Sequence, residues 1–212
     1  MLKKIFEGDY LKRLDNIIQW QEVDVIKHES VSQHSYKVLV FATIALEDIF
    51  GNSDNVEVLK YKLDVIRQSA LHDWDECLLR RDISHETKYN DFNGNALRSE
   101  LDRLSGHLAN KHFTEKKHIG DVSEFPEITS ASKMLKDYIQ NPVCGVKKFV
   151  KWCDWLAVEF YVVREIALGN DDFLNRIEYV HNSQFEAKAE LIEVLASKFP
   201  AEMLNFEKIM EF

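Results

Sequence analysis

The chain of 212 residues has 27 Lys and Arg against 36 Asp and Glu, a formal net charge of −9, and is 45% hydrophobic. These values are ordinary for a soluble globular protein, and the length fits one large domain or at most two small ones. With 7 Gly and 3 Pro, the composition argues against a turn-rich all-β fold. Because the chain is acidic and has no block of like charges, it offers no basic track for a polymeric nucleic acid.

The cysteines and the N-terminus bear on where the protein works. Cys77, Cys144 and Cys153 are odd in number and form no Cys-x-x-Cys pair, which argues against a zinc knuckle or a disulfide framework. Acidic residues come too early in the chain for a signal peptide, and no apolar run reaches membrane-spanning length. We therefore expect a cytoplasmic protein that does not engage a membrane.

The first two predicted elements are helices. The stretch 9–20 places Leu11, Leu14, Ile17 and Ile18 on one side of a helix. Ser30 is followed three residues later by Gln33, the spacing of a capping box, so a second helix is expected to begin there. Its apolar stripe is formed by Val38, Phe41, Ala45 and Ile49, and Gly51 marks its end.

Helical patterns continue to the end of the chain. After a break at 52–54, a third helix carries the apolar stripe Leu59, Leu63, Ile66 and Ala70. The polar stretch 80–95 has no clear period and is expected to be a loop or lid. Further helices are expected near 96–111, 129–139, 146–168 and 173–197, with breaks at 141–145 and 169–172. The pattern predicts one all-α domain over residues 1–212.

Four ionisable residues interrupt these apolar stripes: His34, His72, Asp73 and Asp154. His34 lies one turn before Val38, and Asp73 continues the predicted spacing of the third helix with His72 as its neighbour. Asp154 falls on the buried side of the predicted helix 146–168. Two imidazoles and two carboxylates are thus expected to point inward from three separate helices.

A divalent cation would explain this combination, because carboxylates in a core are costly unless a positive group neutralises them. Mixed His and Asp ligands suit Mn, Co, Fe, Ni or Zn better than Ca. Taken singly, each residue has a more common explanation. An inward His such as His34 is more often a core histidine than a ligand, and Asp154 could pair with a Lys or Arg.

The same residues lie in segments that resemble a known family. These segments are "ESVSQHS" (29–35), "LHDWDE" (71–76), "DISHETKYN" (82–90) and "CDWLAVEFYVVREIALGNDDFL" (153–174). Together they resemble the HD-domain metal-dependent phosphohydrolase superfamily, and within it the bacterial HD-domain 5'-deoxynucleotidases. The resemblance spans residues from about 19 to 175 in the family's order. It implies a single compact HD-domain helical bundle, followed by C-terminal helices over about 173–212.

The resemblance also implies residue roles. His34, His72, Asp73 and Asp154 would be the ligands of one divalent metal ion (Mn, Co, Zn, Fe, Ni or Mg). Glu76 would act beside the metal and Asp82 would line the substrate site, both as catalytic residues. The alternative for Glu76 is a solvated carboxylate at the end of a helix. The implied activity is release of phosphate from deoxynucleoside 5'-monophosphates. Family members commonly form homodimers, which we expect here.

The chain departs from the family pattern at the phosphate-binding position. The family carries an Arg immediately before Trp20, where this chain has Gln19. Gln cannot supply charge-assisted bidentate contacts. Either another cation substitutes, with Lys27, Arg80, Arg81 and Lys88 as candidates, or the phosphate of the substrate is presented differently. Trp20 and Trp74 are candidates for walls around a base or sugar, and ordinary packing explains them equally well.

Two other functions remain open at this stage. One is hydrolysis of deoxynucleoside triphosphates (dNTPs) or another nucleotide, with Arg80 and Arg81 engaging the longer phosphate chain. The segment between Glu76 and Asp82 is one residue longer than in the family, a departure that bears on the role implied for Asp82 and on specificity for monophosphates. The other is a helical module that binds nucleotide without turnover.

Overall fold

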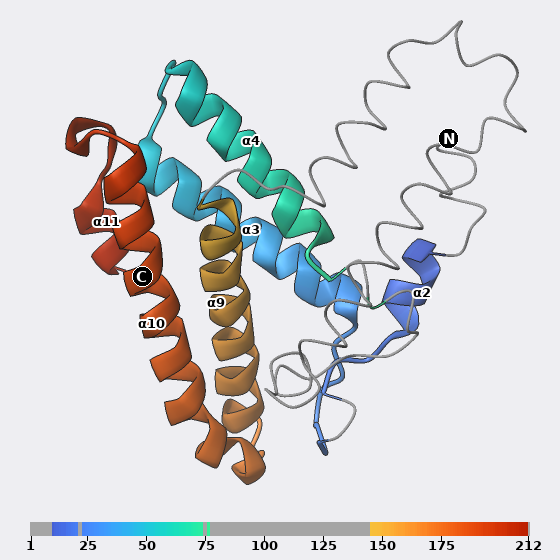
Figure 1. The fold of residues 1–212 in the computed structure, drawn as a ribbon. Coiled ribbons are helices and arrows are strands. Elements are labelled where there is room, and N and C mark those ends of the chain that lie inside the picture. Colours follow the sequence, from blue (N-terminus) through green and yellow to red (C-terminus); the bar gives the residue numbers. More distant parts are fainter. Residues whose placement is uncertain (1–9, 21–22, 74–75, 77–144, 212) are drawn as a thin grey trace, which may run out of the picture.

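The computed structural model describes residues 10–20, 23–73, 76 and 145–211, and within them every regular element is a helix (Figure 1). The elements are α2 (Tyr10–Asn16), α3 (Val31–Phe50), α4 (Val56–Leu71), α9 (Val146–Ala167), η2 (Asp171–Phe173), α10 (Leu174–Lys198), η3 (Ala201–Met203) and α11 (Phe206–Glu211). The prediction of an all-α fold is therefore confirmed. The expected loop at 80–95 and the helices near 96–111 and 129–139 lie outside the described residues. That 1–212 is one domain stays a prediction.

The boundaries of α3 follow from its sequence. The Ser30 side chain accepts a hydrogen bond from the backbone N–H of Gln33, and the Gln33 side chain accepts one from the N–H of Ser30. This is the predicted capping box. Gly51 ends the helix with φ of 55°, a conformation that favours glycine. Both predicted ends of α3 are confirmed.

The first described helix is shorter than predicted. The structure ends α2 at Asn16, so the expectation of a helix through Trp20 is wrong. The helix ends early because the residues after Asn16 pair with the segment before α3. The N–H of Val31 donates to the carbonyl of Ile17 at 2.9 Å, and the N–H of Gln19 donates to the carbonyl of Glu29 at 2.8 Å. These bonds hold the chain after α2 extended against residues 29–31.

The predicted inward face of α4 is wrong by one residue. Its buried residues are Val58, Tyr61, Val65 and Ser69, whereas Leu59 and Leu63 are 49% and 46% exposed. Tyr61 sets this face, because its ring packs edge-on against three aromatic rings, those of Phe50, Phe149 and Phe199. Packing against neighbouring helices thus overrode the stripe that sequence alone favoured.

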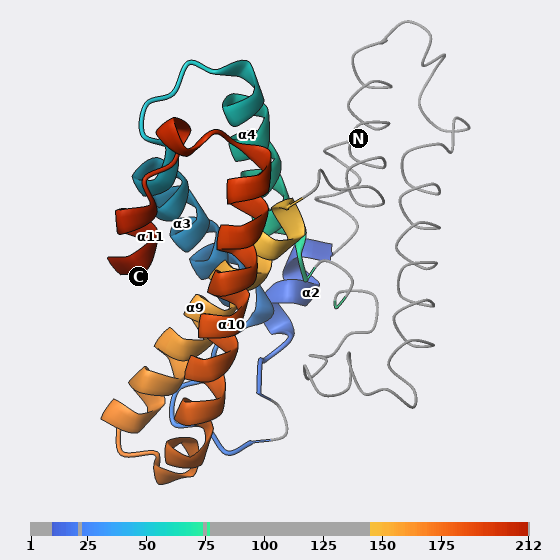
Figure 2. The ribbon, with the colours of Figure 1, turned by 60° about the vertical axis from the view of Figure 1, so that its left-hand side comes forward.

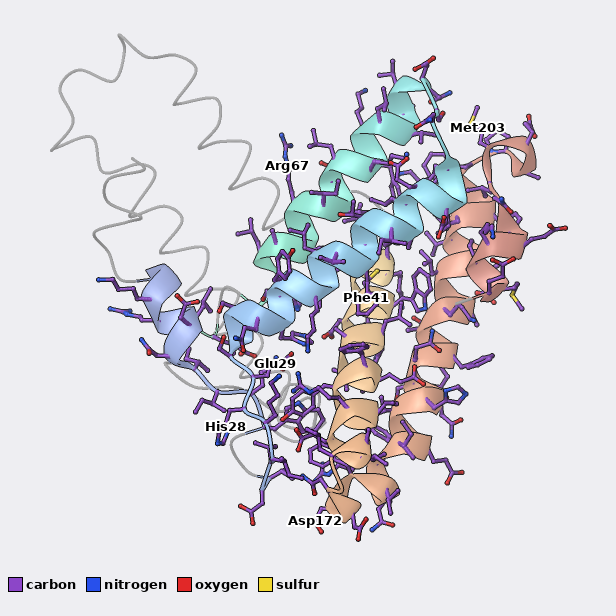
Figure 3. All side chains as sticks on the ribbon, turned by 180° about the vertical axis from the view of Figure 1, so that it is seen from behind. His28, Glu29, Phe41, Arg67, Asp172 and Met203 are labelled. Carbon is purple, nitrogen blue, oxygen red and sulfur yellow. The ribbon has the colours of Figure 1, made fainter. Side chains whose placement is uncertain are left out.

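Two helical hairpins form the body of the described structure (Figures 1 and 2). Helices α3 and α4 run antiparallel, and so do α9 and α10. The turn between α9 and α10 includes Gly169 with φ of 93°, at the predicted break. The hairpins pack through apolar side chains that are almost fully buried, among them Val38, Leu46, Val65, Phe149, Trp152, Leu191 and Leu195. Phe41, labelled in Figure 3, lies between α3 and α9, with its ring 6.2 Å from that of Phe160.

Gly145 fixes where α9 begins. It adopts φ of 88°, and a Cβ at this position would lie 2.5 Å from Cγ1 of Val194 on α10. Its carbonyl accepts a hydrogen bond of 3.1 Å from the Tyr61 hydroxyl on α4. A close backbone approach of this kind requires glycine. The start of α9 is therefore held against α4 and α10. This contact sets the position of α9 along its own axis relative to the two helices.

A buried carboxylate ties the segment before α3 to α9. Glu165 accepts hydrogen bonds from the backbone N–H groups of Ile26 at 2.7 Å and Lys27 at 3.0 Å, and from the side chain of Asn170 at 3.0 Å. Burial alone would raise the pKa of Glu165, but these donors hold it below its usual value. Residues 23–28 are thereby anchored, and Figure 3 shows His28 and Glu29 on the stretch that leads into α3.

None of the helices that the structure describes is long and apolar enough to cross a bilayer.

Candidate metal centre

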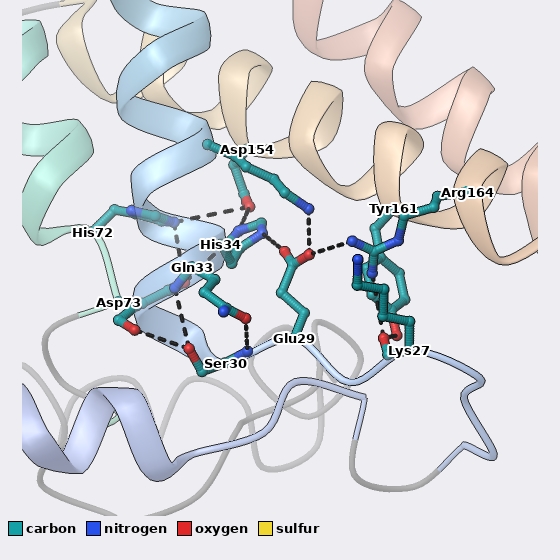
Figure 4. Close-up of polar contacts among 12 residues, drawn as sticks. Lys27, Glu29, Ser30, Gln33, His34, His72, Asp73, Asp154, Tyr161 and Arg164 are labelled. Carbon is teal, nitrogen blue, oxygen red and sulfur yellow. Dashed lines mark hydrogen bonds and ion pairs between the residues drawn. The ribbon is translucent and has the colours of Figure 1, made fainter.

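Three helices bring the four predicted ligands together (Figure 4). His34 comes from the first turn of α3, His72 and Asp73 from the end of α4, and Asp154 from the middle of α9. Nε2 of His34 lies 2.9 Å from Oδ1 of Asp154, and Nε2 of His72 lies 3.1 Å from Oδ2 of Asp73. Residues up to 120 positions apart in the chain thus form one cluster.

The spacing of these atoms fits a single cation. Nε2 of His34 lies 3.9 Å from Oδ2 of Asp73, and Nε2 of His72 lies 4.0 Å from Oδ1 of Asp154. Ligands held about 2.1 Å from one ion in octahedral geometry are roughly 3.0 to 4.2 Å apart. His34, His72 and Asp154 each offer one ligand atom, and all three atoms lie within 4.8 Å of one another. A nitrogen and oxygen donor set suits a divalent transition metal or Zn.

The orientation of His72 also suits a ligand. Its Nδ1 lies 2.8 Å from the carbonyl oxygen of Ser69, one turn earlier on α4. Since a carbonyl only accepts, this contact assigns a hydrogen to Nδ1 and leaves the lone pair of neutral His72 on Nε2, which faces the cluster. Metal-binding imidazoles usually donate their outer N–H to such an acceptor.

The charges in the cluster call for a cation. Burial alone would lower the pKa of His72, but the charge and hydrogen bond of Asp73, with the charge of Asp154, raise it to about 9. Burial would raise the pKa of Asp154, yet Lys151 and the two imidazoles hold it well below its usual range. The carboxylates therefore favour positive charge between them. A divalent ion would supply more of it than a proton, and its binding would release the proton from His72.

Glu76 lies beside the cluster in a buried position. It is 1% exposed, and its N–H donates to the carbonyl of Asp73 at 3.1 Å. The alternative of a solvated carboxylate at a helix end is therefore wrong. Its catalytic role stays a prediction.

The residues expected to bind substrate are only partly described. Gln19 is 8% exposed. Trp20 has φ of 62°, and its ring stacks on Tyr161 at 5.7 Å with an edge contact to Phe173. Lys27 is exposed, and its backbone is bonded to Glu165 and Tyr161. The remaining candidates, Trp74, Arg80, Arg81, Asp82 and Lys88, lie outside the described residues.

Two residues at the centre were not predicted from sequence. Lys151, on α9, places Nζ 3.2 Å from Oδ2 of Asp154 and 4.7 Å from the centre of the Trp155 ring. Its i,i+3 spacing from Asp154 was a signal that could have identified it. Glu29, 2% exposed, has Oε1 3.9 Å from Nδ1 of His34. Glu29 precedes α3, in an irregular segment where apolar periodicity gives no indication of burial.

Comparison with known proteins settles the family. The model of the family described as YfbR-like 5'-deoxynucleotidase matches residues 8–203. The chain belongs to the YfbR-like family. This YfbR-like protein is accordingly a metal-dependent phosphohydrolase, and the resemblance noted from the sequence is confirmed.

The fold agrees with that assignment. The crystal structure of an HD-domain phosphohydrolase from Listeria innocua superposes with a TM-score of 0.60 at 17% sequence identity, covering 99% of this chain and 92% of the other. The YfbR-like chain therefore has the HD-domain fold, as predicted. No curated protein matches the chain.

Proposed function

We propose that this YfbR-like protein hydrolyses deoxynucleoside 5'-monophosphates (dNMPs) to a deoxynucleoside and phosphate. The observation that carries the proposal is the convergence of His34, His72, Asp73 and Asp154 in a chain of this family. These four side chains would together hold one divalent cation.

The chain's residues divide the chemistry between them. His34, His72, Asp73 and Asp154 would hold a divalent cation, which would lower the pKa of an attacking water and neutralise charge on the phosphoryl group. Glu76, buried beside Asp73, takes a proton from that water and returns a proton to the leaving 5'-oxygen. The phosphorus–oxygen bond to the nucleoside breaks as the bond to the water oxygen forms.

Lys151 supports recognition of the phosphate in place of the family Arg. Its ammonium group lies beside the Asp154 carboxylate and its side chain is 29% exposed, so solvent reaches it. An ammonium group next to a divalent cation is repelled by it, and an anion bound between the two relieves that repulsion. A phosphate group fits this position. With Lys151 supplying the positive charge for phosphate binding, an uncharged residue at position 19 is sufficient.

Replacing Lys151 by Gln is expected to raise the KM for a dNMP by about 10- to 100-fold, the value of a lost charge-assisted hydrogen bond. Steady-state phosphate release with dAMP as substrate measures this change. Lys148→Gln is the matched control, because Lys148 lies one turn earlier on α9 and pairs with Glu190 away from the centre. An unchanged KM in Lys151→Gln would assign phosphate binding to another residue.

A second candidate is dNTP hydrolysis, favoured by Gln19 at the position of the monophosphate-binding Arg. A panel of dNMPs, dNTPs and ribonucleoside monophosphates with Mn, Co or Mg distinguishes the two. Free phosphate from dNMPs supports the first proposal, and pyrophosphate or triphosphate from dNTPs supports the second. No product with any metal, together with a thermal shift on adding nucleotide, would indicate binding without turnover. A homodimer and a cytoplasmic location stay predictions.

A further inference from the structure

The two imidazoles of the metal centre differ on their outer sides. Both direct Nε2 toward the cluster, and Nδ1 of His72 meets the carbonyl of Ser69 at 2.8 Å. Nδ1 of His34 is also buried, but it makes no hydrogen bond to any residue that the structure describes. The group facing it is Oε1 of Glu29 at 3.9 Å, itself buried and without a hydrogen bond among those residues. One donor and one acceptor thus face each other just beyond bonding distance.

The surroundings of Glu29 leave that oxygen for His34. Lys37 and Arg164 both contact the other oxygen, Oε2, with Nη1 of Arg164 at 3.5 Å (Figure 4). A carboxylate that served only to pair with these cations could turn both oxygens toward them. The side chain is 2% exposed, and its backbone carbonyl accepts the N–H of Gln19, so it is fixed from several sides.

We propose that Glu29 is a positioning residue for the metal ligand His34. Oε1 accepts the Nδ1–H of His34, so that the imidazole keeps its lone pair on Nε2 and directs it to the cation. Closing the gap between the two atoms takes a movement of roughly 1 Å to normal hydrogen-bond length. The inference rests on the proposed ligand role of His34 and adds to the proposed function a residue that acts on metal affinity rather than on substrate.

Glu29→Gln tests the proposal with little change of shape. Lys37 and Arg164 only donate, so they retain the amide oxygen and leave the amide NH2 toward His34. That NH2 group donates to Nδ1 and shifts the imidazole hydrogen to Nε2, where it blocks coordination. Loss of such a supporting contact typically weakens metal binding by about 10- to 100-fold. We expect a Kd for Mn²⁺ raised by that factor in titration calorimetry of the metal-free protein.

Glu165→Gln is the matched control. Glu165 is also buried and also holds the segment before α3, but its hydrogen bonds are with Ile26, Lys27 and Asn170 rather than with a metal ligand. Both variants are expected to lower the melting temperature of the metal-free protein, and only Glu29→Gln should weaken Mn²⁺ binding. Nitrogen NMR of the Zn²⁺-loaded wild type should show the His34 hydrogen on Nδ1.

Equal Mn²⁺ affinity in Glu29→Gln and wild type would overturn the proposal, as would an equal loss in Glu165→Gln. If wild type bound neither Mn²⁺ nor Zn²⁺, the ligand assignment and the proposal would both be wrong. These measurements use no nucleotide. A protein that failed to hydrolyse dNMPs could therefore still show weaker Mn²⁺ binding in Glu29→Gln alone, which would support the role of Glu29. The two failures are therefore distinguishable.

Discussion

Asp154→Asn is expected to abolish phosphate release, lowering kcat/KM by at least about a thousandfold. Oδ1 of Asp154 lies 2.9 Å from Nε2 of His34 and 4.0 Å from Nε2 of His72, so it is close to both imidazoles of the cluster. A neutral amide of the same shape is a weak metal ligand and no longer offsets the positive charge of the ion. Phosphate release at saturating Mn²⁺, with metal content measured after gel filtration, should show activity and bound metal lost together.

The same helix supplies a closely matched control. Glu159 has a side chain as exposed as that of Asp154, 23% in each case, and it also pairs with an imidazole, Nδ1 of His181 at 2.8 Å. Glu159→Gln therefore removes a comparable carboxylate from α9 without touching the metal centre, and activity should be retained. Activity that survived Asp154→Asn would show that the ligand assignment is wrong.

The helical pattern predicted the cluster well where a residue sits inside a regular helix. His34 belongs to the buried stripe of α3 with Val38 and Ala45, and the capping box at Ser30 fixed where that helix begins. Asp154 likewise lies one turn from the buried Val150 and Ala157 on α9. In both cases the period of the helix and a local end signal were enough, because neither depends on distant contacts.

The prediction for Asp73 was right for a wrong reason. It was placed inward as a continuation of Leu59 and Leu63, which are half-exposed in the structure. The true buried face runs through Tyr61, Val65 and Ser69, and a further turn along it reaches both His72 and Asp73. Asp73 lies three residues after Ala70 on the predicted face and four residues after Ser69 on the observed face. Because both spacings correspond to about one helical turn, either face places Asp73 inward.

The contacts of the segment before α3 could not be read from sequence. Glu29 is buried by cations from two different helices, Lys37 on α3 and Arg164 on α9. The end of α2 similarly depends on the hydrogen bond from the N–H of Val31 to the carbonyl of Ile17. Contacts of this kind join irregular segments to distant elements and leave no periodic signal, so only the fold reveals them.

Glu76→Gln is expected to lower kcat by about 10²- to 10⁴-fold while Mn²⁺ still binds. Glu76 is 1% exposed and follows Asp73 by one turn, with its N–H bonded to the Asp73 carbonyl. An amide fills the same space but can no longer take a proton from water. Single-turnover phosphate release measures the chemical step, and calorimetric titration with Mn²⁺ measures binding at the centre.

The two active-site variants separate two roles for a carboxylate. A ligand variant, Asp154→Asn, should lose bound metal and activity together, even at saturating Mn²⁺. Glu76→Gln should keep the wild-type Kd for Mn²⁺ and stay slow at any Mn²⁺ concentration, because its defect lies in proton transfer. Metal loss in Glu76→Gln that tracked its loss of rate would instead make Glu76 a further metal ligand. In that case another group would have to take the proton from the attacking water.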